Sequence, residues 1–422
     1  MAAKPVYVHL GLPKTGTTYI QSALWGSREK LASTGCLVPG ERSAASWLAA
    51  SDLLGRRPQG TDVPAVVGRW SDFVEAIRGW DGDRVILSQE LLGSATKRQA
   101  QRMVKSLSPC DVHVVVTVRD LARTLPSVWQ QEIRKGRTWT WGEFVSAVQD
   151  PDRGPATAGV AFWLRFDVQR LLKLWDGVVQ AANIHVVIVP PGGAPADALL
   201  ARFAEATGVD RAVLTGTQPV ANTAVGMAEA EVLRRLNVGL AGGLNERQYA
   251  RAVVQAVVPA LQERTSSTRG QLPVGHRSWV ADRSEDLVAF LDRHPYHVVG
   301  DLTDLTPPVG ASAPDPDALG EAELVQPLTD ALVAVCTTYG KYWSQARRRE
   351  EAGATGVRTR FASRARAVAY RSRRTVLERA DNNRVFGRMA RAYLRRSASG
   401  ASAGFRNEGT NAAASGRTSR ED

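Results

Sequence analysis

The N-terminal stretch from Val6 to Leu24 combines residue types that suit the binding of an anion. It reads Val-Tyr-Val-His-Leu-Gly-Leu-Pro-Lys-Thr-Gly-Thr-Thr-Tyr-Ile-Gln-Ser-Ala-Leu, which predicts a short apolar strand, a turn and the start of a helix. Backbone N–H groups at a helix N-terminus point toward an anion, and the helix dipole favours negative charge there. Gly11 and Gly16 let the backbone approach a ligand closely. Because Thr17 and Thr18 add hydroxyl donors, we expect this loop to cradle a phosphate-like group.

The position of its lysine separates this loop from the loops that bind nucleoside triphosphates. Gly11 and Gly16 have the glycine spacing of such a loop, but that class places lysine directly after the second glycine. Here Thr17 follows Gly16, and Lys14 lies inside the loop. A small-molecule kinase would also need a strand-borne Asp for Mg²⁺, and Asp120 lies beyond its strand. Lys14 is instead placed beside the terminal groups of a ligand, where charge develops on a bridging oxygen.

The run Pro13-Lys14-Thr15-Gly16-Thr17-Thr18 resembles the 5′-phosphosulfate-binding loop of sulfotransferases that use 3′-phosphoadenosine 5′-phosphosulfate (PAPS). Its place after the N-terminal strand is also that of the family, and the resemblance spans about residues 5–190, with the helix and strand of 162–191 similar to bacterial members. It implies that PAPS is the donor and that no metal is needed. It further implies that the 5′-phosphate is held by Thr15, Gly16, Thr17 and Thr18, while Lys14 neutralises the bridging oxygen as the 3′,5′-bisphosphate leaves.

A second candidate for anion binding follows the strongest predicted strand, residues 112–118. Arg119 leaves the end of this strand, where a guanidinium group can bind a phosphate through two hydrogen bonds. Ser127 lies eight residues on, in the following predicted helix, and offers a hydroxyl. An Arg at a strand end with a Ser eight residues later resembles the segment of sulfotransferases that binds the 3′-phosphate of the donor. The alternative is a surface salt bridge between Arg119 and Asp120.

An acceptor hydroxyl also needs a base, and the resemblance implies a His or a Glu. Glu90 is the first choice because it follows the predicted strand 85–88 and would lie at the carboxyl end of that strand. Glu41 is the second choice, since it lies 27 residues after Lys14, in a region that supplies the base in some relatives. His9 is the third, because its strand leads into the loop. The alternatives are a helix-start carboxylate for Glu90 and a core histidine for His9.

Strands alternate with helices along the chain, and this pattern predicts the fold class. Buried strands are predicted at four apolar runs, residues 6–10, 85–88, 112–118 and 184–189. The near-continuous β-branched run at 112–118 is typical of a parallel strand that is covered on both faces. We therefore expect an α/β protein, a three-layer sandwich with a mainly parallel central sheet, in which ligands bind outside the carboxyl ends of the strands.

Aromatic side chains are candidates for stacking on a sugar ring or on the donor adenine, with core packing as the alternative for each. Those near the second anion-binding segment are Trp129, Trp139, Trp141 and Trp163. A helix is predicted at 162–178. Residues 271–284 are expected to form a loop, from which three side chains could close over the donor, namely His276, Arg277 and Trp279.

Composition divides the chain into a body and a basic tail. The predicted parts are an α/β domain at 1–306, a Pro-rich linker at 307–320, a helix at 321–349 and a basic tail at 350–422. Residues 347–422 hold 19 arginines, no lysine and seven acidic residues, which accounts for the whole net charge of +12. The body is neutral, so the basic pI does not indicate nucleic acid as a partner. We expect the tail to be largely disordered or a peripheral helix on an anionic membrane.

The remaining features limit the class of protein. Cys36, Cys110 and Cys336 lie far apart, and the six histidines show no ligand spacing, so neither disulfides nor a metal site is expected. No signal-peptide pattern and no membrane-spanning run is found, which favours a cytoplasmic protein whose tail could contact the inner membrane face.

We expect a PAPS-dependent sulfotransferase that moves a sulfuryl group to a hydroxyl of a carbohydrate or (glyco)lipid acceptor by in-line displacement. The rival hypotheses are a P-loop small-molecule kinase and a non-enzymatic protein that binds anionic surfaces through its arginine-rich tail.

Overall fold

The computed structural model describes residues 3–41, 43–56, 63–215, 225–264, 272–307 and 314–353. The chain divides into two compact units, Met1–Cys336 and Thr337–Asp422. From residue 354 on, the predicted basic tail lies outside the described residues. Among the helices in the described ranges, none has the length and apolar character needed to cross a bilayer.

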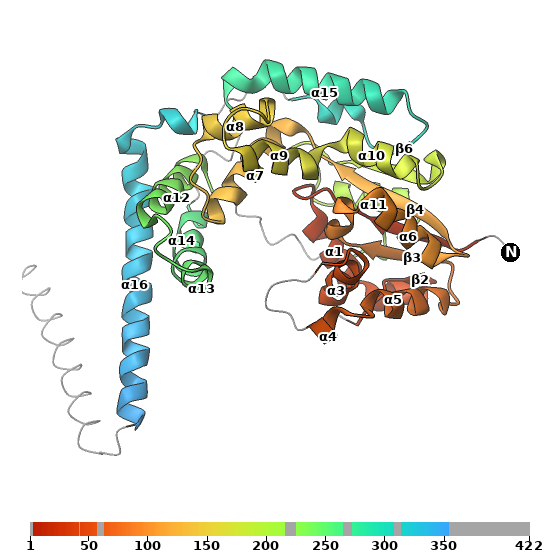
Figure 1. Ribbon diagram of the computed structural model, residues 1–422, viewed down its shortest axis with the longest axis horizontal. Helices are drawn as coiled ribbons and strands as arrows, with labels where there is room; N and C mark the ends of the chain where they lie inside the picture. Colours follow the sequence, from red (N-terminus) through yellow and green to blue (C-terminus); the bar gives the residue numbers. More distant parts are fainter. Residues whose placement is uncertain are drawn as a thin grey trace, which may run out of the picture. The chain divides into compact units, whose positions relative to one another are not determined.

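A sheet of parallel strands forms the centre of the first unit (Figure 1). The strands are β1 (Pro5–His9), β2 (Cys36–Leu37), β3 (Arg84–Ser88), β4 (Asp111–Val118), β5 (Ile184–Ile188) and β6 (His297–Val299), in the order β2-β3-β1-β4-β5-β6. β1 lies between β3 and β4, with Val6 beside Val85 and Val112. The chain leaves β1 toward β2 on one side of the sheet and leaves β4 toward β5 on the other, so β1 and β4 flank the point where strand order reverses. In open parallel sheets, ligands bind outside the carboxyl ends at this point.

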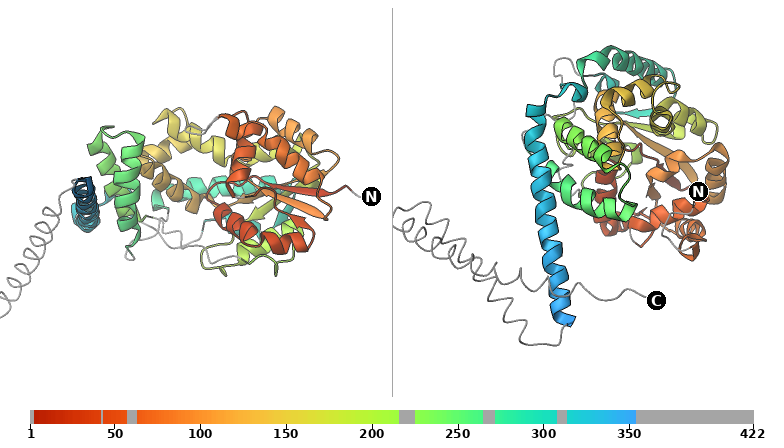
Figure 2. Two further views of the ribbon diagram at one scale, coloured as in Figure 1. Left: turned by 90° about the horizontal axis from the view of Figure 1, so that it is seen from below. Right: turned by 60° about the vertical axis from the view of Figure 1, so that its left-hand side comes forward.

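Helices cover both faces of the sheet and complete the predicted α/β sandwich (Figure 2). One face is covered by α3 (Ser43–Leu53), α5 (Arg69–Arg78), α6 (Lys97–Leu107), α10 (Val168–Asp176) and α15 (Arg277–Asp292). The other is covered by α1 (Thr17–Gly26), α2 (Arg28–Ser33) and α11 (Ala198–Thr207). Val6 and Val8 enter the first core, whereas Tyr7 between them packs against the second. Burial on both faces explains why the strands are almost continuously apolar.

A third hydrophobic core lies within helices beyond the end of β4. It is built by α7 (Leu121–Arg134), α8 (Trp141–Gln149), α9 (Ala156–Phe166), α12 (Met227–Leu240), the π-helix η3 (Ala250–Val257) and α14 (Val258–Gln262), and α13 (Glu246–Tyr249) leads into η3. Trp129 and Trp141 are fully buried there and meet edge to face, with ring centroids 5.8 Å apart. These two rings therefore serve core packing, and neither is available to stack on a ligand.

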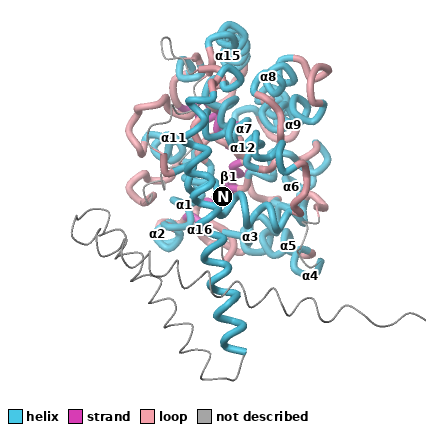
Figure 3. Tube along the Cα trace, turned by 90° about the vertical axis from the view of Figure 1, so that its left-hand side faces the viewer, coloured by secondary structure: helices cyan, strands magenta, loops and turns pink. Residues whose placement is uncertain are grey.

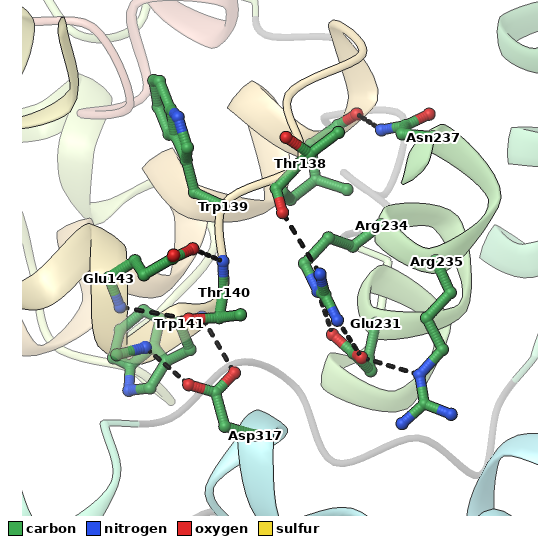
Figure 4. A network of polar contacts seen from close by, with 12 residues as sticks. Thr138, Trp139, Thr140, Trp141, Glu143, Glu231, Arg234, Arg235, Asn237 and Asp317 are labelled. Carbon is green, nitrogen blue, oxygen red and sulfur yellow. Dashed lines mark hydrogen bonds and ion pairs between the residues drawn. The ribbon is translucent and has the colours of Figure 1, made fainter. Parts of the chain in front are cut away.

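Polar contacts fasten this core at the start of α8 (Figure 4). Asp317, in the short helix η6 (Pro316–Ala318), accepts hydrogen bonds from the amides of Trp141 and Gly142 at 2.9 and 2.7 Å. A carboxylate at a helix N-terminus satisfies free amides and meets the positive end of the dipole. The later part of the predicted 307–320 linker thus contacts the body. Residues 308–313 of that linker lie outside the described residues, and the domain boundaries stay a prediction.

Two sequence-based expectations about the helices were wrong. The single helix predicted at 162–178 is two helices, because Asp167 ends α9 and caps α10 by accepting from the Arg170 amide at 2.9 Å. The loop predicted at 271–284 is helical from Arg277 on, which places Arg277 and Trp279 on α15.

The remaining elements are α4 (Val63–Val66), the short helices η1 (Glu90–Ser94), η2 (Ala181–Asn183), η4 (Val274–His276) and η5 (Leu302–Leu305), and the long helix α16 (Glu321–Gly353).

Three histidines form a hydrogen-bonded chain near the amino ends of neighbouring strands. His113 Nδ1 lies 2.9 Å from His185 Nε2, and His185 Nδ1 lies 2.8 Å from His297 Nδ1. At one end of the chain, His113 Nε2 lies 3.2 Å from the Asp111 carboxylate. Burial lowers the pKa of His185 to about 4, and the charges of His113 and His297 act in the same direction. Within the described residues, no group of three or more His, Cys, Asp or Glu could hold a metal ion.

Candidate functional site

The anion-binding loop lies at the carboxyl end of β1 and continues along β4. The Leu12 amide donates to the Thr117 carbonyl at 3.1 Å, and the Thr117 amide donates to the Gly11 carbonyl at 2.6 Å. Gly16 adopts φ +87° as the residue that begins α1, and a Cβ there would lie 2.3 Å from Leu199 Cδ2. Both the left-handed conformation and the close side chain require glycine. The loop therefore ends at the free amides of a helix N-terminus, as the sequence predicted.

Lys14 lies half-buried in this loop among other cations. The Arg119 Nη1 donates to the Lys14 carbonyl at 3.0 Å, which ties the predicted second anion site to the first. Burial, then the positive charges of Arg134, Lys135 and Arg119, lower the pKa of Lys14 to about 8, against the opposing effect of Glu90. Sequence reasoning did not include Arg134 and Lys135, because they lie at the far end of α7 and only the fold places their charge near the loop.

The threonines of the loop have different surroundings. Thr15 is buried and donates its hydroxyl to the Leu12 carbonyl, with Thr117 Oγ1 also within hydrogen-bond distance. Thr17 is buried and donates its hydroxyl to the Glu90 carboxylate. Thr18 is exposed on the first turn of α1. In this arrangement, the means of holding an anion are the backbone amides from Thr15 to Thr18 and the Thr18 hydroxyl.

Arg119 does not form the surface salt bridge with Asp120 that was the alternative. Asp120 is buried and caps α7 by accepting from the Arg123 amide at 2.8 Å, and its other oxygen pairs with the Arg123 guanidinium. Arg123 is fixed further by donating to the Pro190 carbonyl at 2.8 Å. Arg119 Nε is a buried donor with no hydrogen-bond partner among the described residues. Burial lowers the pKa of Arg119 to about 10, so the group stays charged at neutral pH.

Glu90 is the candidate base that the fold brings to the loop. It begins η1 directly after β3, and its Cγ lies 3.4 Å from the position that a Cβ on Gly11 would occupy. Burial raises the pKa of Glu90, whereas the charge of Lys14 lowers it. A carboxylate with a raised pKa is a stronger base at neutral pH, so this environment suits proton abstraction.

His9 has the surroundings of a core histidine, which was the alternative to a catalytic role. Its side chain is fully buried, with Nδ1 2.8 Å from Ser88 Oγ and Nε2 3.3 Å from Thr117 Oγ1. Burial lowers the pKa of His9 to about 3, so the ring is neutral at physiological pH. With both nitrogens occupied and no exposed surface, His9 supports the strand ends beneath the loop rather than contacting a substrate.

Two predicted residues are not joined to the loop in this structure. Glu41 is exposed between β2 and α3, and in the described ranges no hydrogen bond or ion pair links it to the site. Ser127 is half-buried on α7, and no hydrogen bond joins it to Arg119 within those ranges. A role for either residue stays a prediction.

An open pocket extends from Arg119 on the side of α7. Its walls include Leu12, Thr124, Trp163, Phe166, Arg283 and Leu287. The Arg283 guanidinium lies 5.2 Å from the centroid of the Trp163 ring, so the pocket combines an aromatic surface with a second cation. Arg283 was missed because its segment was interpreted as the end of a loop.

Comparison with known proteins shows a distant structural likeness. No family model matches the chain, and no curated protein matches it. A solved structure of a sulfotransferase from Alicyclobacillus acidocaldarius is similar over 59% of this chain and 100% of its own, with 13% identity and a TM-score of 0.32. A likeness at this level carries no argument about function. The case for an activity therefore depends on the site itself.

Proposed function

We propose that the protein is a PAPS-dependent sulfotransferase. The observation that supports this most directly is Arg119, whose Nη1 is fixed on the Lys14 carbonyl while its buried Nε lacks a partner in the described chain. Leaving a buried donor unsatisfied costs about 1–3 kcal/mol, and a phosphate oxygen would remove that cost through a charge-assisted hydrogen bond. Two adjacent anion sites joined by one hydrogen bond suit a nucleotide with phosphates at its 3′ and 5′ positions.

The proposed reaction transfers the sulfuryl group of PAPS to a hydroxyl of a carbohydrate or (glyco)lipid acceptor. The acceptor oxygen forms the new bond to sulfur, and the bond from sulfur to the bridging oxygen breaks, leaving its electron pair on the 5′-phosphate. Lys14 stabilises that charge, as electrostatic positioning does in related phosphoryl transfers. Glu90 takes the proton from the acceptor hydroxyl. The acceptor class comes from the family resemblance and is part of the proposal.

The pocket beside Arg119 is the proposed site for the adenosine part of the donor. Trp163 offers a ring face, and base–aromatic stacking is worth about 1–3 kcal/mol. Arg119, which would bind the 3′-phosphate, and Trp163 line the same pocket. The ribose phosphate and the adenine base of one nucleotide could therefore contact both residues. Trp163→Ala should therefore weaken binding of the nucleotide about tenfold or more while leaving binding of inorganic sulfate unchanged.

Calorimetry with 3′,5′-adenosine bisphosphate tests donor recognition. We expect binding to weaken at least about 100-fold in both Lys14→Ala and Arg119→Ala, because each variant removes a charge-assisted contact. Lys30→Ala and Arg153→Ala, which remove the same residue types at exposed sites elsewhere, are the controls. Equal affinity for ATP, or no binding of the bisphosphate, would overturn the proposal and favour the kinase or a non-enzymatic role.

The assignment of the base is tested by amide variants of the two candidate carboxylates. Glu90→Gln should lower turnover about 100-fold or more, as expected for loss of a general base, and leave bisphosphate affinity nearly unchanged. Glu41→Gln is the matched comparison, because the same change falls on an exposed carboxylate. Normal turnover in Glu90→Gln with a loss in Glu41→Gln would move the role to Glu41. A chain lacking residues 350–422 should retain transfer if the tail is not the functional part.

A further inference from the structure

α16 is one long continuous helix (Figure 3), and one of its exposed faces carries a regular apolar stripe. Its members follow one another in alternating steps of three and four residues, namely Val325, Leu328, Leu332, Val335, Tyr339 and Tyr342. Their side chains are between 38% and 70% exposed. The average step of 3.5 residues is that of the a and d positions in a coiled coil, where a second helix lies along the first. We call these six residues the α16 seam.

The seam is separate from the face by which the helix packs on the body. Leu324, Pro327 and Ala331 are buried, and Asp330 pairs with Arg264 beside them. Three- and four-residue steps place that packed face and the seam on different sides of the same helix. Because α16 is a single continuous helix, the six seam residues lie along one line on its surface. Large exposed apolar patches of this kind mark interaction surfaces.

The chemistry of the seam favours an identical helix as its partner. From Val325 to Trp343 the charged residues are Asp330, which is paired on the other face, and Lys341. Two copies can therefore meet without like-charge repulsion, and each presents the apolar stripe that the other needs. Six seam side chains with the adjacent Trp343 offer on the order of several hundred Å² per helix, within reach of the roughly 800 Å² per partner of a stable interface. The chain's own residues 354–422 fit less well, since their arginines would find no carboxylate along the seam.

We propose that α16 forms a coiled-coil interface between two copies of this chain through the α16 seam. The protein would then be a homodimer with the axis of symmetry at this helix. Apolar side chains that are exposed in one copy become buried against the same side chains of the other.

Sedimentation velocity and light scattering of the full chain test this proposal. We expect a particle of twice the chain mass of 45.6 kDa at micromolar concentration. Leu332→Asp, at 61% exposure in the middle of the seam, should reduce it to a monomer. Val333→Asp is the matched control, because Val333 is also exposed, at 58%, but is rotated by about 100° from Leu332 around the helix axis and lies outside the seam, so this variant should remain a dimer. Thermal melts should show that both variants stay folded.

Four outcomes would overturn the proposal. A monomeric wild-type chain at all concentrations would do so, and so would a Leu332→Asp variant that is still a dimer. A monomer whose seam amides exchange faster once residues 354–422 are removed would assign the seam to the chain's own residues 354–422. Binding of the wild-type monomer to anionic lipid vesicles, lost in Leu332→Asp, would assign the seam to a membrane instead.

Discussion

The two ends of the central sheet both hold buried ionisable side chains, but they differ in how the charges are balanced. At the amino end, a carboxylate only accepts hydrogen bonds, so Asp111 fixes the hydrogen of His113 on Nε2. His113 Nδ1 must then accept from His185 Nε2, and His185 Nδ1 must accept from His297 Nδ1. Each hydrogen bond in this chain then has one donor and one acceptor. The chain of bonds is complete without any other molecule.

At the carboxyl end of the sheet, the positive charges outnumber the carboxylates that face them. Four cations, Lys14, Arg119, Arg134 and Lys135, act on one another there, and Glu90 is the carboxylate that opposes them at Lys14. Arg119 Nε has no partner in the described chain. The comparison suggests a general distinction: polar groups that satisfy one another support the fold, whereas excess positive charge with an unsatisfied donor is the arrangement expected of an anion-binding site.

The largest effect should come from removing the lysine at the unbalanced end. Lys14→Ala is expected to lower turnover of sulfuryl transfer by about 10²–10³-fold, the usual loss when one donor to a developing oxyanion is removed. His113→Gln at the balanced end should leave turnover at the wild-type level. Steady-state kinetics with labelled donor measures both. Similar losses in the two variants would remove the functional distinction between the ends.

The second effect concerns stability as a function of pH. The pKa of His185 in the folded state, about 4, lies below the ordinary value of 6.5, so the unfolded chain binds the proton more tightly. Its contribution is complete above about pH 6.5 and is lost as pH falls toward 4, which amounts to about 2–3 kcal/mol at 1.4 kcal/mol per pKa unit. Urea unfolding at pH 7.5 and 4.5 measures this loss. His185→Phe should show a smaller loss, with part retained because buried His9 behaves in the same way; an unchanged loss would contradict the assignment.

The third effect concerns the free energy of unfolding when a glycine with positive φ is replaced by alanine. It separates the cost of backbone strain from the cost of a close side chain. Gly16 and Gly55 both have positive φ, at +87° and +64°, but a Cβ at Gly55 would meet nothing within 4 Å. Gly55→Ala should therefore cost about 1 kcal/mol of unfolding free energy from strain alone. Gly16→Ala should cost about 2 kcal/mol, because Leu199 must also move. Chemical denaturation compares the two, and equal costs would show that Leu199 gives way freely.

The smallest effect is the pH dependence of anion binding. Because the pKa of Lys14 is lowered to about 8, the lysine is protonated below that pH and loses its charge above it. Affinity for 3′,5′-adenosine bisphosphate should fall up to about tenfold between pH 8 and 9. In Lys14→Arg the guanidinium stays charged, so the affinity should not change over this range. Calorimetry at the two pH values decides, and a wild-type affinity that is constant would show that Lys14 keeps its proton.

Much of the fold followed from local patterns. The β-branched run at 112–118 indicated a doubly covered parallel strand, and the loop with Gly16 indicated a strand, a turn and a helix start. β6 was missed because three residues, His297–Val299, are too short for periodicity to register. The α9–α10 break was missed because Asp167 acts as a cap in the middle of an apolar run. Only the hydrogen bond to Arg170 distinguishes it from an ordinary surface acid.

The site was predictable where it depends on neighbours in sequence. Lys14, Glu90 and Arg119 were predicted to lie near one another because each follows a predicted strand, and the carboxyl ends of β1, β3 and β4 do meet at one edge of the sheet. Their roles stay predictions. Asp120 pairs with Arg123 rather than with Arg119, and this choice of partner could not be predicted from the sequence. It depends on how the first turn of α7 is oriented. The hydrogen bond between the buried hydroxyls of Thr15 and Thr117 could not be predicted either, because the two residues are more than a hundred positions apart in the sequence.

The hydrogen bond from Thr17 to Glu90 bears on the order in which substrates bind. A hydroxyl has one hydrogen, so Thr17 can donate it to the carboxylate or to a donor phosphate, but not to both at once. While the hydrogen is on Glu90, it stabilises the charged carboxylate and makes it a weaker base. If a bound donor takes this hydrogen, Glu90 gains basicity only when the sulfuryl group is in place. Such coupling favours an ordered sequence, donor first and acceptor second, and disfavours proton removal from an acceptor that arrives alone.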